Sequence, residues 1–432
     1  MIGYHLQPVK ATLSGILYYE IQTIKLIYSL VFLFLCGCAC EKQTETIVPP
    51  LAVKGVLDLS GWVFDRDGPV KLTGEFGFYW KQLLNPQDFV QNSPPLKADF
   101  IAVPRTWNGF EYQGEAISGD GYATYRLTVL IDADDTELAL KTLELSTSFN
   151  LFVNGQKLSS AGVFGQTAKS AKPGLHPEIV GFKANKDVLD IVVQVSNFSH
   201  KHGGFWETIT LGTREQLLKR NELQIALNLF LFGSILIIGL YHLGIYSLRR
   251  NAWSALYFGL FCLIIALRIL ITGERYFLLL FPGIDYEIII KAEYLTFYLA
   301  LPVFVQYFYS LFSSRFPKII PTLSTIIGLM FGAVVILFPV KIFSHTLGVY
   351  QVFTLAMFVY ATVILVAASI KKEIMAIIFL AGFSILFVLS VNDMLYAQSI
   401  IQAQYMVQFG LFIFIFPRPI SFPGIFQTHL SP

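Results

Sequence analysis

The sequence predicts an all-β domain exposed to water, followed by an α-helical bundle of seven membrane-spanning helices. Two observations predict this fold class. Short β-type runs separated by Gly, Pro and Asn fill the first half, and seven apolar runs follow residue 221. Of the 432 residues, 54% are apolar and only 14% are charged, which is too apolar for an average soluble protein. The net charge of +2 and the lack of a basic stripe argue against a nucleic-acid partner.

Residues 1–40 are expected to form an export signal. The apolar core after Lys25 is about ten residues long and spans about 15 Å as a helix, half of a hydrocarbon layer of roughly 30 Å. The Leu-Cys-Gly-Cys run that ends at Cys38 resembles a lipoprotein cleavage site, in which Cys38 would carry the lipid. An ordinary signal peptide cut near Ala39 is the alternative. Residues 41–56 are expected to be a linker.

The cysteines exclude a disulfide framework for the β domain. Three of the four lie in the export signal, and Cys262 lies in an apolar run. No Cys/His spacing suits zinc, so neither a metal nor another cofactor is expected.

Residues 57–212 are expected to form an antiparallel β-sandwich. Runs rich in β-formers lie between turn residues, at 123–131, 138–145, 149–153 and 189–195. Asn154-Gly155 directly follows the third run and predicts a tight hairpin, because both residues tolerate positive φ. No long helical period interrupts these runs.

The order of these strands resembles the jelly-roll, galactose-binding-like domains attached to glycoside hydrolases. A ligand of such a domain would be a carbohydrate, and a tryptophan ring can stack on a sugar. The candidate ligand-binding residues are Trp107, His200, His202 and Trp206, with Trp62 and Trp80 as further tryptophans. Core packing of the tryptophans and solvated loop positions for the histidines are the alternatives. No catalytic residue is identified.

A single helix is expected to connect the two parts. Thr213 with Gln216 matches a capping box, and no proline follows before residue 250. A helix over residues 213–248 would be about 54 Å long, longer than a bilayer core of roughly 30 Å. Such a helix could transmit a push or a rotation. A passive stalk that breaks near Asn221 is the alternative.

The seven apolar runs have lengths suited to membrane-spanning helices, except that the last is short. They lie at 224–246, 253–272, 289–312, 319–340, 346–368, 374–396 and 401–416.

Charges in the loops predict the orientation of the bundle. One set of loops holds Arg249, Arg250, Arg315, Lys318, Lys371 and Lys372. The opposite set holds only Arg275 and Lys341. Because cytoplasmic loops are enriched in Lys and Arg, the first set is expected inside and the β domain outside.

Polar residues inside the apolar runs are the candidate functional residues of the membrane part. They are Arg268, Lys291, Glu293 and Asp393. Such residues are costly in lipid and are expected to cluster toward the outer face. Interfacial snorkelling is the alternative, mainly for Lys291 and Glu293.

Scattered motifs across residues 57–416 resemble a bacterial receptor family. The residues that carry the resemblance are Leu57 to Trp62, Gly68 to Glu75, Phe78 to Trp80, Val103-Pro104, Trp107-Asn108, Gly121 to Arg126, Gly204 to Trp206 and Tyr241 to Gly244. They are similar to the seven-transmembrane receptors with diverse intracellular signalling modules, in the branch with the type 2 extracellular domain. The resemblance implies a multi-pass protein of the bacterial inner membrane that senses an extracytoplasmic ligand.

The family resemblance also implies a cytoplasmic output module, which the C-terminal residues 417–432 do not resemble. Prolines at 417, 419 and 423 cannot continue a helix. The sequence is therefore expected to lack an output enzyme, to place a short tail in the cytoplasm and to signal through a separate cytoplasmic protein. A membrane-anchored carbohydrate-binding module and a transporter are the alternative functions.

Overall fold

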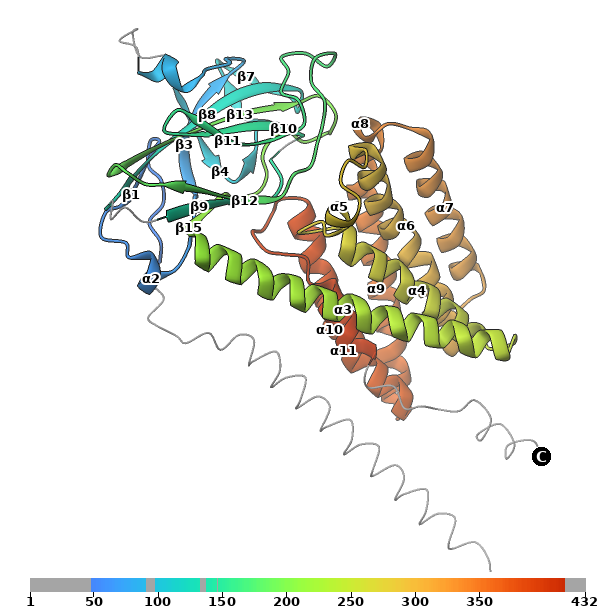
Figure 1. Cartoon of the computed structure of the whole chain (residues 1–432). Coiled ribbons are helices and arrows are strands. Elements are labelled where there is room, and N and C mark those ends of the chain that lie inside the picture. The colour runs from blue at the N-terminus through green and yellow to red at the C-terminus, as the bar shows by residue number, and fades with distance from the viewer. Residues whose placement is uncertain (1–47, 91–97, 133–136, 146, 416–432) are drawn as a thin grey trace, which may run out of the picture. The chain divides into compact units, whose positions relative to one another are not determined.

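The computed structural model describes residues 48–90, 98–132, 137–145 and 147–415. Its strands lie between Val56 and Thr213, and its long helices follow from Arg214 onward (Figure 1). This order confirms the predicted fold class of a β domain followed by a helical region. The described residues form two compact units, one of residues 48–352 and 398–402 and the other of residues 353–397 and 403–415.

Two sheets make up most of the β domain. The larger sheet has the order β11-β10-β13-β8-β3-β4, with β1 parallel to β8. Its strands are β1 (Val56–Leu59), β3 (Gly74–Trp80), β4 (Asp99–Val103), β8 (Gly121–Ile131), β10 (Ser148–Val153), β11 (Gln156–Ala161) and β13 (Val188–Asn197). The smaller sheet has the order β12-β9-β15-β2, from β12 (Glu178–Lys183), β9 (Glu137–Thr142), β15 (Thr210–Thr213) and β2 (Val70–Lys71).

Short elements complete the β domain. They are the pair β5 (Arg105–Thr106) and β14 (Gly204–Phe205), the pair β6 (Glu111–Tyr112) and β7 (Glu115–Ala116), α2 (Phe64–Asp67) and the 3-10 turn η1 (Pro86–Phe89).

Both sheets contribute to one apolar core. Tyr125, Leu127 and Val129 alternate along β8 with no exposed surface, and Leu140 and Leu211 reach the same core from the smaller sheet. A sheet buries one face through this period of two. The β domain is therefore a two-layer sandwich.

The hairpin predicted at Asn154-Gly155 joins β10 to β11. Asn154 has φ 49° and Gly155 has φ 87°, the pair of positive values that a tight hairpin requires.

Helix α3 (Arg214–Leu248) follows β15 without a break. Its N-cap is Thr213, whose hydroxyl accepts the Gln216 N–H at 3.3 Å, while the Gln216 side chain accepts the Thr213 N–H at 3.4 Å. The predicted capping box and connecting helix are confirmed, and the alternative break near Asn221 is not present.

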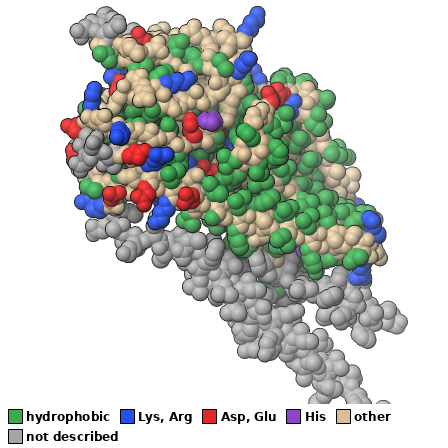
Figure 2. Space-filling view, viewed as in Figure 1, with side chains coloured by type: hydrophobic (Ala, Val, Ile, Leu, Met, Phe, Trp, Pro, Cys, Tyr) green, Lys and Arg blue, Asp and Glu red, His purple; other side chains and the backbone are tan. Residues whose placement is uncertain are grey.

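Of the remaining helices, the long ones α4, α6, α7, α9 and α10 match the predicted apolar runs closely. They are α4 (Trp253–Ile271), α5 (Phe277–Leu280), α6 (Tyr286–Leu311), α7 (Ile319–Leu337), α8 (Val340–Phe343), the 3-10 turn η2 (Ser344–Thr346), α9 (Leu347–Ile370), α10 (Ile374–Ala397) and α11 (Val407–Ile415). Within the described residues, six helices are long and apolar enough to cross a membrane. Hydrophobic side chains cover the helical region in Figure 2, whereas charged side chains gather on the β domain. The chain is a multi-pass membrane protein.

The seventh predicted span, 401–416, was placed too early. Helix α11 begins at Val407, because the carboxylate of Asp393 accepts the backbone N–H groups of Met406 at 2.7 Å and Val407 at 3.0 Å. An acidic side chain at these unpaired N–H groups starts a helix. The predicted export signal, Cys38 and the C-terminal tail lie outside the described residues.

Candidate functional site at the junction of the β domain and the helices

Polar side chains join the β domain to the helical part of the larger unit, and two of these contacts form the candidate site. The first, which we call the arginine contact, brings Glu144 of the β domain together with Arg275 and Glu293. The second, which we call the loop contact, brings Asp120 and Lys201 together with Lys341 and Ser344.

Arg275 is the centre of the arginine contact. Its guanidinium donates to Glu144 Oε2 at 2.7 Å and lies 3.1 Å from Glu293 Oε2 on α6. It also donates to the carbonyl of Ile271, at the end of α4, at 3.0 Å. Only 5% of Arg275 is exposed. One buried cation therefore holds a carboxylate of the β domain and a carboxylate of a membrane helix at the same time.

A second ion pair involves Glu274, the residue that precedes Arg275. Lys141 of β9 donates to Glu274 at 2.6 Å and to the side-chain carbonyl of Asn221 on α3 at 3.1 Å. Thus β9 is tied both to the loop after α4 and to the first turns of α3. Charged hydrogen bonds of this kind are stronger than neutral ones.

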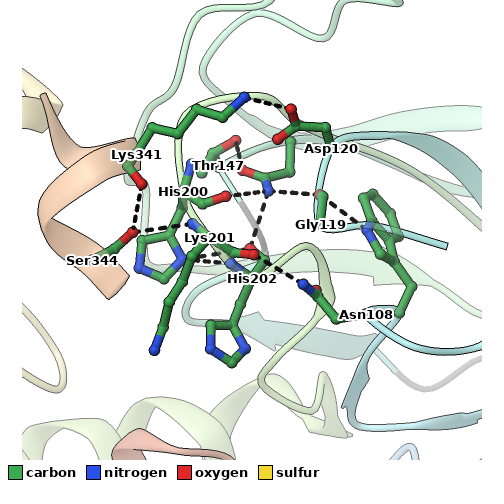
Figure 3. Close-up of polar contacts among 11 residues, drawn as sticks. Asn108, Gly119, Asp120, Thr147, His200, Lys201, His202, Lys341 and Ser344 are labelled. Carbon is green, nitrogen blue, oxygen red and sulfur yellow. Dashed lines mark hydrogen bonds and ion pairs between the residues drawn. The ribbon is translucent and has the colours of Figure 1, made fainter. Parts of the chain in front are cut away.

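Figure 3 shows the loop contact. Lys341 of α8 pairs with Asp120, and the backbone N–H of Lys201 donates to Ser344 Oγ at 3.2 Å. Asp120 and Lys201 belong to two loops of the β domain that are far apart in sequence. Both loops therefore touch the same short helical segment between α7 and α9.

Asn197 holds these two loops together. Its buried side-chain amide donates to the carbonyls of Gly119 at 2.8 Å, His200 at 2.8 Å and His202 at 3.1 Å. Its side-chain oxygen accepts the His200 N–H at 3.1 Å and the Thr147 hydroxyl at 3.1 Å. Asn197 thus sets the backbone that presents the loop contact.

Asn108 fixes the same loop from a second side. Its amide donates to the carbonyl of Lys201 at 2.9 Å and accepts the N–H of Gly203 at 2.9 Å. The loop between β13 and β14 is therefore rigidly held although it has no regular secondary structure.

His200, His202 and Trp206, which the sequence analysis proposed as ligand-binding residues, lie together on this loop. The rings of His200 and Trp206 are 4.6 Å apart, and those of His200 and His202 are 6.0 Å apart. All three side chains are half-buried. The indole N–H of Trp206 is buried and has no hydrogen-bond partner.

Burial controls the protonation of both histidines. It lowers the pKa of His200 to about 3 and that of His202 to about 4, and neighbouring positive charges add to the effect. His200 Nδ1 accepts the His202 N–H at 3.2 Å, because an amide nitrogen can only donate. A neutral His200 therefore carries its proton on Nε2.

Trp107 is not available to a ligand. It has no exposed surface, packs against Trp80 at 5.0 Å and donates its indole N–H to the Gly119 carbonyl at 3.1 Å. Trp80 is also buried in the core, and Trp62 donates to the Gly68 carbonyl at 3.0 Å. Trp107 therefore fits the alternative of core packing and not a place where a sugar stacks, because none of its surface is exposed.

The predicted membrane residues separate into different roles. Arg268 donates to the backbone carbonyl of Glu293 at 2.9 Å, so these two lie together near the arginine contact. Lys291 pairs with Glu287 one helical turn away, at 2.8 Å, within α6. Asp393 belongs to the other unit, where it caps α11.

Sequence reasoning did not identify Arg275 and Glu144 as site residues. Arg275 was counted only as a loop charge, and Glu144 lies in an ordinary strand pattern. The loop after α4 and the end of β9 are about 130 residues apart, so no spacing in the sequence connects them. Among the described residues, no group of three or more His, Cys, Asp and Glu is placed to hold a metal ion.

Comparison with known proteins gives one family and a set of distant structures. Residues 224–417 match the family described as 7TM diverse intracellular signalling. Similar solved structures include β-glucuronidases from Ruminococcus gnavus (14% identity, TM-score 0.26, covering 33% of this chain and 27% of that chain) and Faecalibacterium prausnitzii (15%, 0.26, 33% and 31%). The chain spans less than a third of the length of these enzymes, and a likeness this limited carries no conclusion about ligands. No curated protein sequence matches the chain.

Proposed function

We propose that the β domain is the extracytoplasmic sensor of this chain and that the junction transmits the signal. The proposal starts from residues 224–417, which match the family described as 7TM diverse intracellular signalling. The ligand is a small extracytoplasmic molecule, with carbohydrate as the class that the sequence favours. The protein lies in the bacterial inner membrane, with the loops rich in Lys and Arg in the cytoplasm.

The arginine contact is the observation that carries this proposal. A passive anchor needs no buried ion pair between its soluble domain and its membrane helices, and such a pair is costly to desolvate. Here Arg275 serves Glu144 and Glu293 together. Movement of β9 changes how strongly Arg275 holds Glu293, and so acts on the start of α6.

Helix α3 supplies a second route. It begins at the last strand of the β domain and continues as one helix of 35 residues, about 52 Å long. Lys141 ties β9 to this helix through Asn221. A rotation of the β domain is therefore carried into the membrane by a rigid rod.

Transmission is tested with a reporter at the far ends of the helices. Asn251→Cys, in the exposed loop between α3 and α4, carries an environment-sensitive fluorophore in the purified full chain. Arg275→Gln is expected to shift the emission of this label, because it breaks the link between the β domain and the helices.

The matched control for that experiment is Lys291→Gln. It removes a charge from the same end of the helices, but its ion pair with Glu287 lies within α6. The control is expected to leave the emission unchanged. Equal spectra for the parent and for Arg275→Gln would contradict transmission through Arg275.

A double-mutant cycle measures the strength of the link. Glu144→Gln and Arg275→Gln, alone and together, are expected to give a coupling free energy of about 1.5–3 kcal/mol, because the pair is charged and buried. Arg214 and Glu137 form a comparable pair between α3 and β9 at 2.8 Å, but both side chains are more than half exposed. That control cycle is expected to give less than about 1 kcal/mol.

A further inference from the structure

The loop between β13 and β14 places an unusual set of hydrogen-bond donors next to the loop contact. These donors are the Nε2–H of neutral His200, the ammonium of Lys201 and the indole N–H of Trp206. His200, Lys201 and Trp206 are half-buried residues, and the indole N–H of Trp206 is itself buried. In Figure 3 the side chains of His200, Lys201 and His202 extend from the loop on the same side, away from the pair formed by Asp120 and Lys341.

The charges that act on the two histidine rings are positive. Those that act on the His200 ring come from His202, Lys201 and His345, and all three lower its pKa. The same is true of His202, on which Lys201 and His345 act. Lys341 on α8 is already paired with Asp120, and Glu207 is half-buried just beyond Trp206.

The indole N–H of Trp206 is a donor without an acceptor. A buried donor left unpaired is destabilising, so an acceptor supplied by a ligand would be stabilised there. The ring of His200 lies 4.6 Å from that of Trp206. The two rings and the Lys201 ammonium are donors without a bound acceptor, in a positive environment.

We propose that His200, Lys201 and Trp206 bind the anionic group of the sensed ligand, a small molecule that carries a carboxylate. This inference rests on the proposed sensor function and specifies its ligand class. An anion oxygen accepts from the indole N–H and from Nε2–H, and the Lys201 ammonium balances its charge. The site lies beside the hydrogen bond from Lys201 to Ser344, so binding bears directly on the helical segment after α7.

The proposal is tested with a matched pair of probes on the purified full chain in detergent. D-galacturonate and D-galactose differ in one position, which is a carboxylate in the first and a hydroxymethyl group in the second. Calorimetric titration is expected to detect galacturonate and not galactose. Inorganic phosphate, the third probe, separates recognition of any anion from recognition of a sugar acid.

Variants assign the binding to the named residues. Lys201→Met and Trp206→Phe are each expected to weaken galacturonate binding about ten-fold, the effect of losing one charged hydrogen bond. Lys183→Met removes an exposed lysine from β12 of the same domain and is expected to bind as the parent does. The thermal unfolding of each variant shows that it is folded.

The pH dependence adds a readout that a structural role would not move. A bound anion that restores the pKa of His200 from about 3 to about 6.5 makes binding about ten-fold tighter at pH 5.5 than at pH 7.5. The tightening is expected to be lost in His200→Gln.

The possible outcomes separate clearly. Binding of galacturonate that Lys201→Met weakens supports the proposed site, and binding of phosphate without galacturonate would contradict a carboxylate ligand. Equal binding of galactose and galacturonate, no binding of any probe, or binding that Lys201→Met, Trp206→Phe and His200→Gln all leave unchanged would overturn it. The double-mutant cycle at Arg275 does not depend on a ligand, so failure here leaves the proposed transmission to be judged by its own experiment.

Discussion

At the scale of single residues, buried polar side chains define the junction. Asn197 is fully buried and donates to three carbonyl groups, of which that of Gly119 also accepts from Trp107. Arg275 plays the corresponding part for two carboxylates. Each side chain binds groups from segments that are distant in sequence. Its removal is therefore expected to affect several segments at once.

Replacement of Asn197 is expected to destabilise the protein strongly. Asn197→Ala removes the donors to the carbonyls of Gly119, His200 and His202, of which only that of Gly119 keeps a second donor, the indole N–H of Trp107. We expect the free energy of unfolding to fall by about 2–3 kcal/mol in denaturant titrations of the full chain. Asn251→Ala, at an exposed position, is expected to change it by less than about 0.5 kcal/mol. A similar small change for Asn197→Ala would show that water replaces the amide.

The stability of the protein is expected to depend on His200 below neutral pH. The pKa of His200 is lowered to about 3 in the folded state, against about 6.5 when unfolded, so the unfolded chain takes up a proton first. Stability is therefore fully present above pH 6.5 and is lost as the pH falls toward 3.

Unfolding at pH 7.5 and pH 5.0 measures this effect. The parent is expected to lose about 1–2 kcal/mol more than His200→Gln over this interval. His176→Gln replaces a histidine whose side chain is 60% exposed, and it is expected to behave as the parent does. Identical pH profiles for the parent and His200→Gln would show that His200 is protonated in the folded protein.

At the scale of elements, α3 joins the β domain to the membrane helices. Its sequence carries both a start signal for a helix and the first apolar span, so one helix belongs to the β domain at one end and to the membrane at the other. Gln216 strengthens the joint, because its side-chain N–H group also donates to the carbonyl of Phe64 in α2, at 2.6 Å. A helix that is fixed at its first turn can act as a lever.

Loss of the cap is expected to loosen this joint. Thr213→Ala removes the acceptor of the Gln216 N–H and is expected to lower the free energy of unfolding by about 1 kcal/mol. Thr213→Ser keeps the hydroxyl and is expected to retain most of the stability. Hydrogen exchange should rise in the first turn of α3 in the alanine variant only. Equal exchange in both variants would argue that packing, and not the cap, starts the helix.

At the scale of the whole molecule, the two loops with few positive charges are the loops that meet the β domain. Arg275 and Lys341, their basic residues, pair with Glu144 and Asp120 of that domain. The loops with the larger share of Lys and Arg, such as Arg249-Arg250, make up the opposite set. The charge bias and these contacts within the larger unit therefore agree on which ends of the helices share a side with the β domain.

Labelling in cells tests this orientation. Asn154→Cys, in the exposed hairpin of the β domain, is expected to react with a membrane-impermeant maleimide in spheroplasts. Asn251→Cys is expected to react only after permeabilisation. The parent chain sets the background from the buried Cys262 and from the three cysteines of the export signal. The reverse pattern would place the β domain in the cytoplasm and contradict the sensor proposal.

The sequence alone predicted the elements that depend on local patterns. The strand over residues 123–131, the hairpin at Asn154, the cap at Thr213 and six of the seven spans follow from periods of two and 3.6, from turn chemistry and from hydropathy. All of these signals lie within a few residues of the element they describe. Helix α11 begins later in the chain than the predicted seventh span, because its start depends on Asp393, a side chain from the preceding helix.

Only the tertiary structure decided which polar residues meet. Trp107 and Trp206 look alike in sequence, yet one lies in the core and the other borders a half-buried loop. By sequence Arg275 is an ordinary charged loop residue, but in the folded protein it pairs with two carboxylates. Burial and charge pairing depend on contacts between segments more than 100 residues apart, and no local period or motif encodes such contacts. For this protein the sequence therefore determined the architecture, and the fold determined the site.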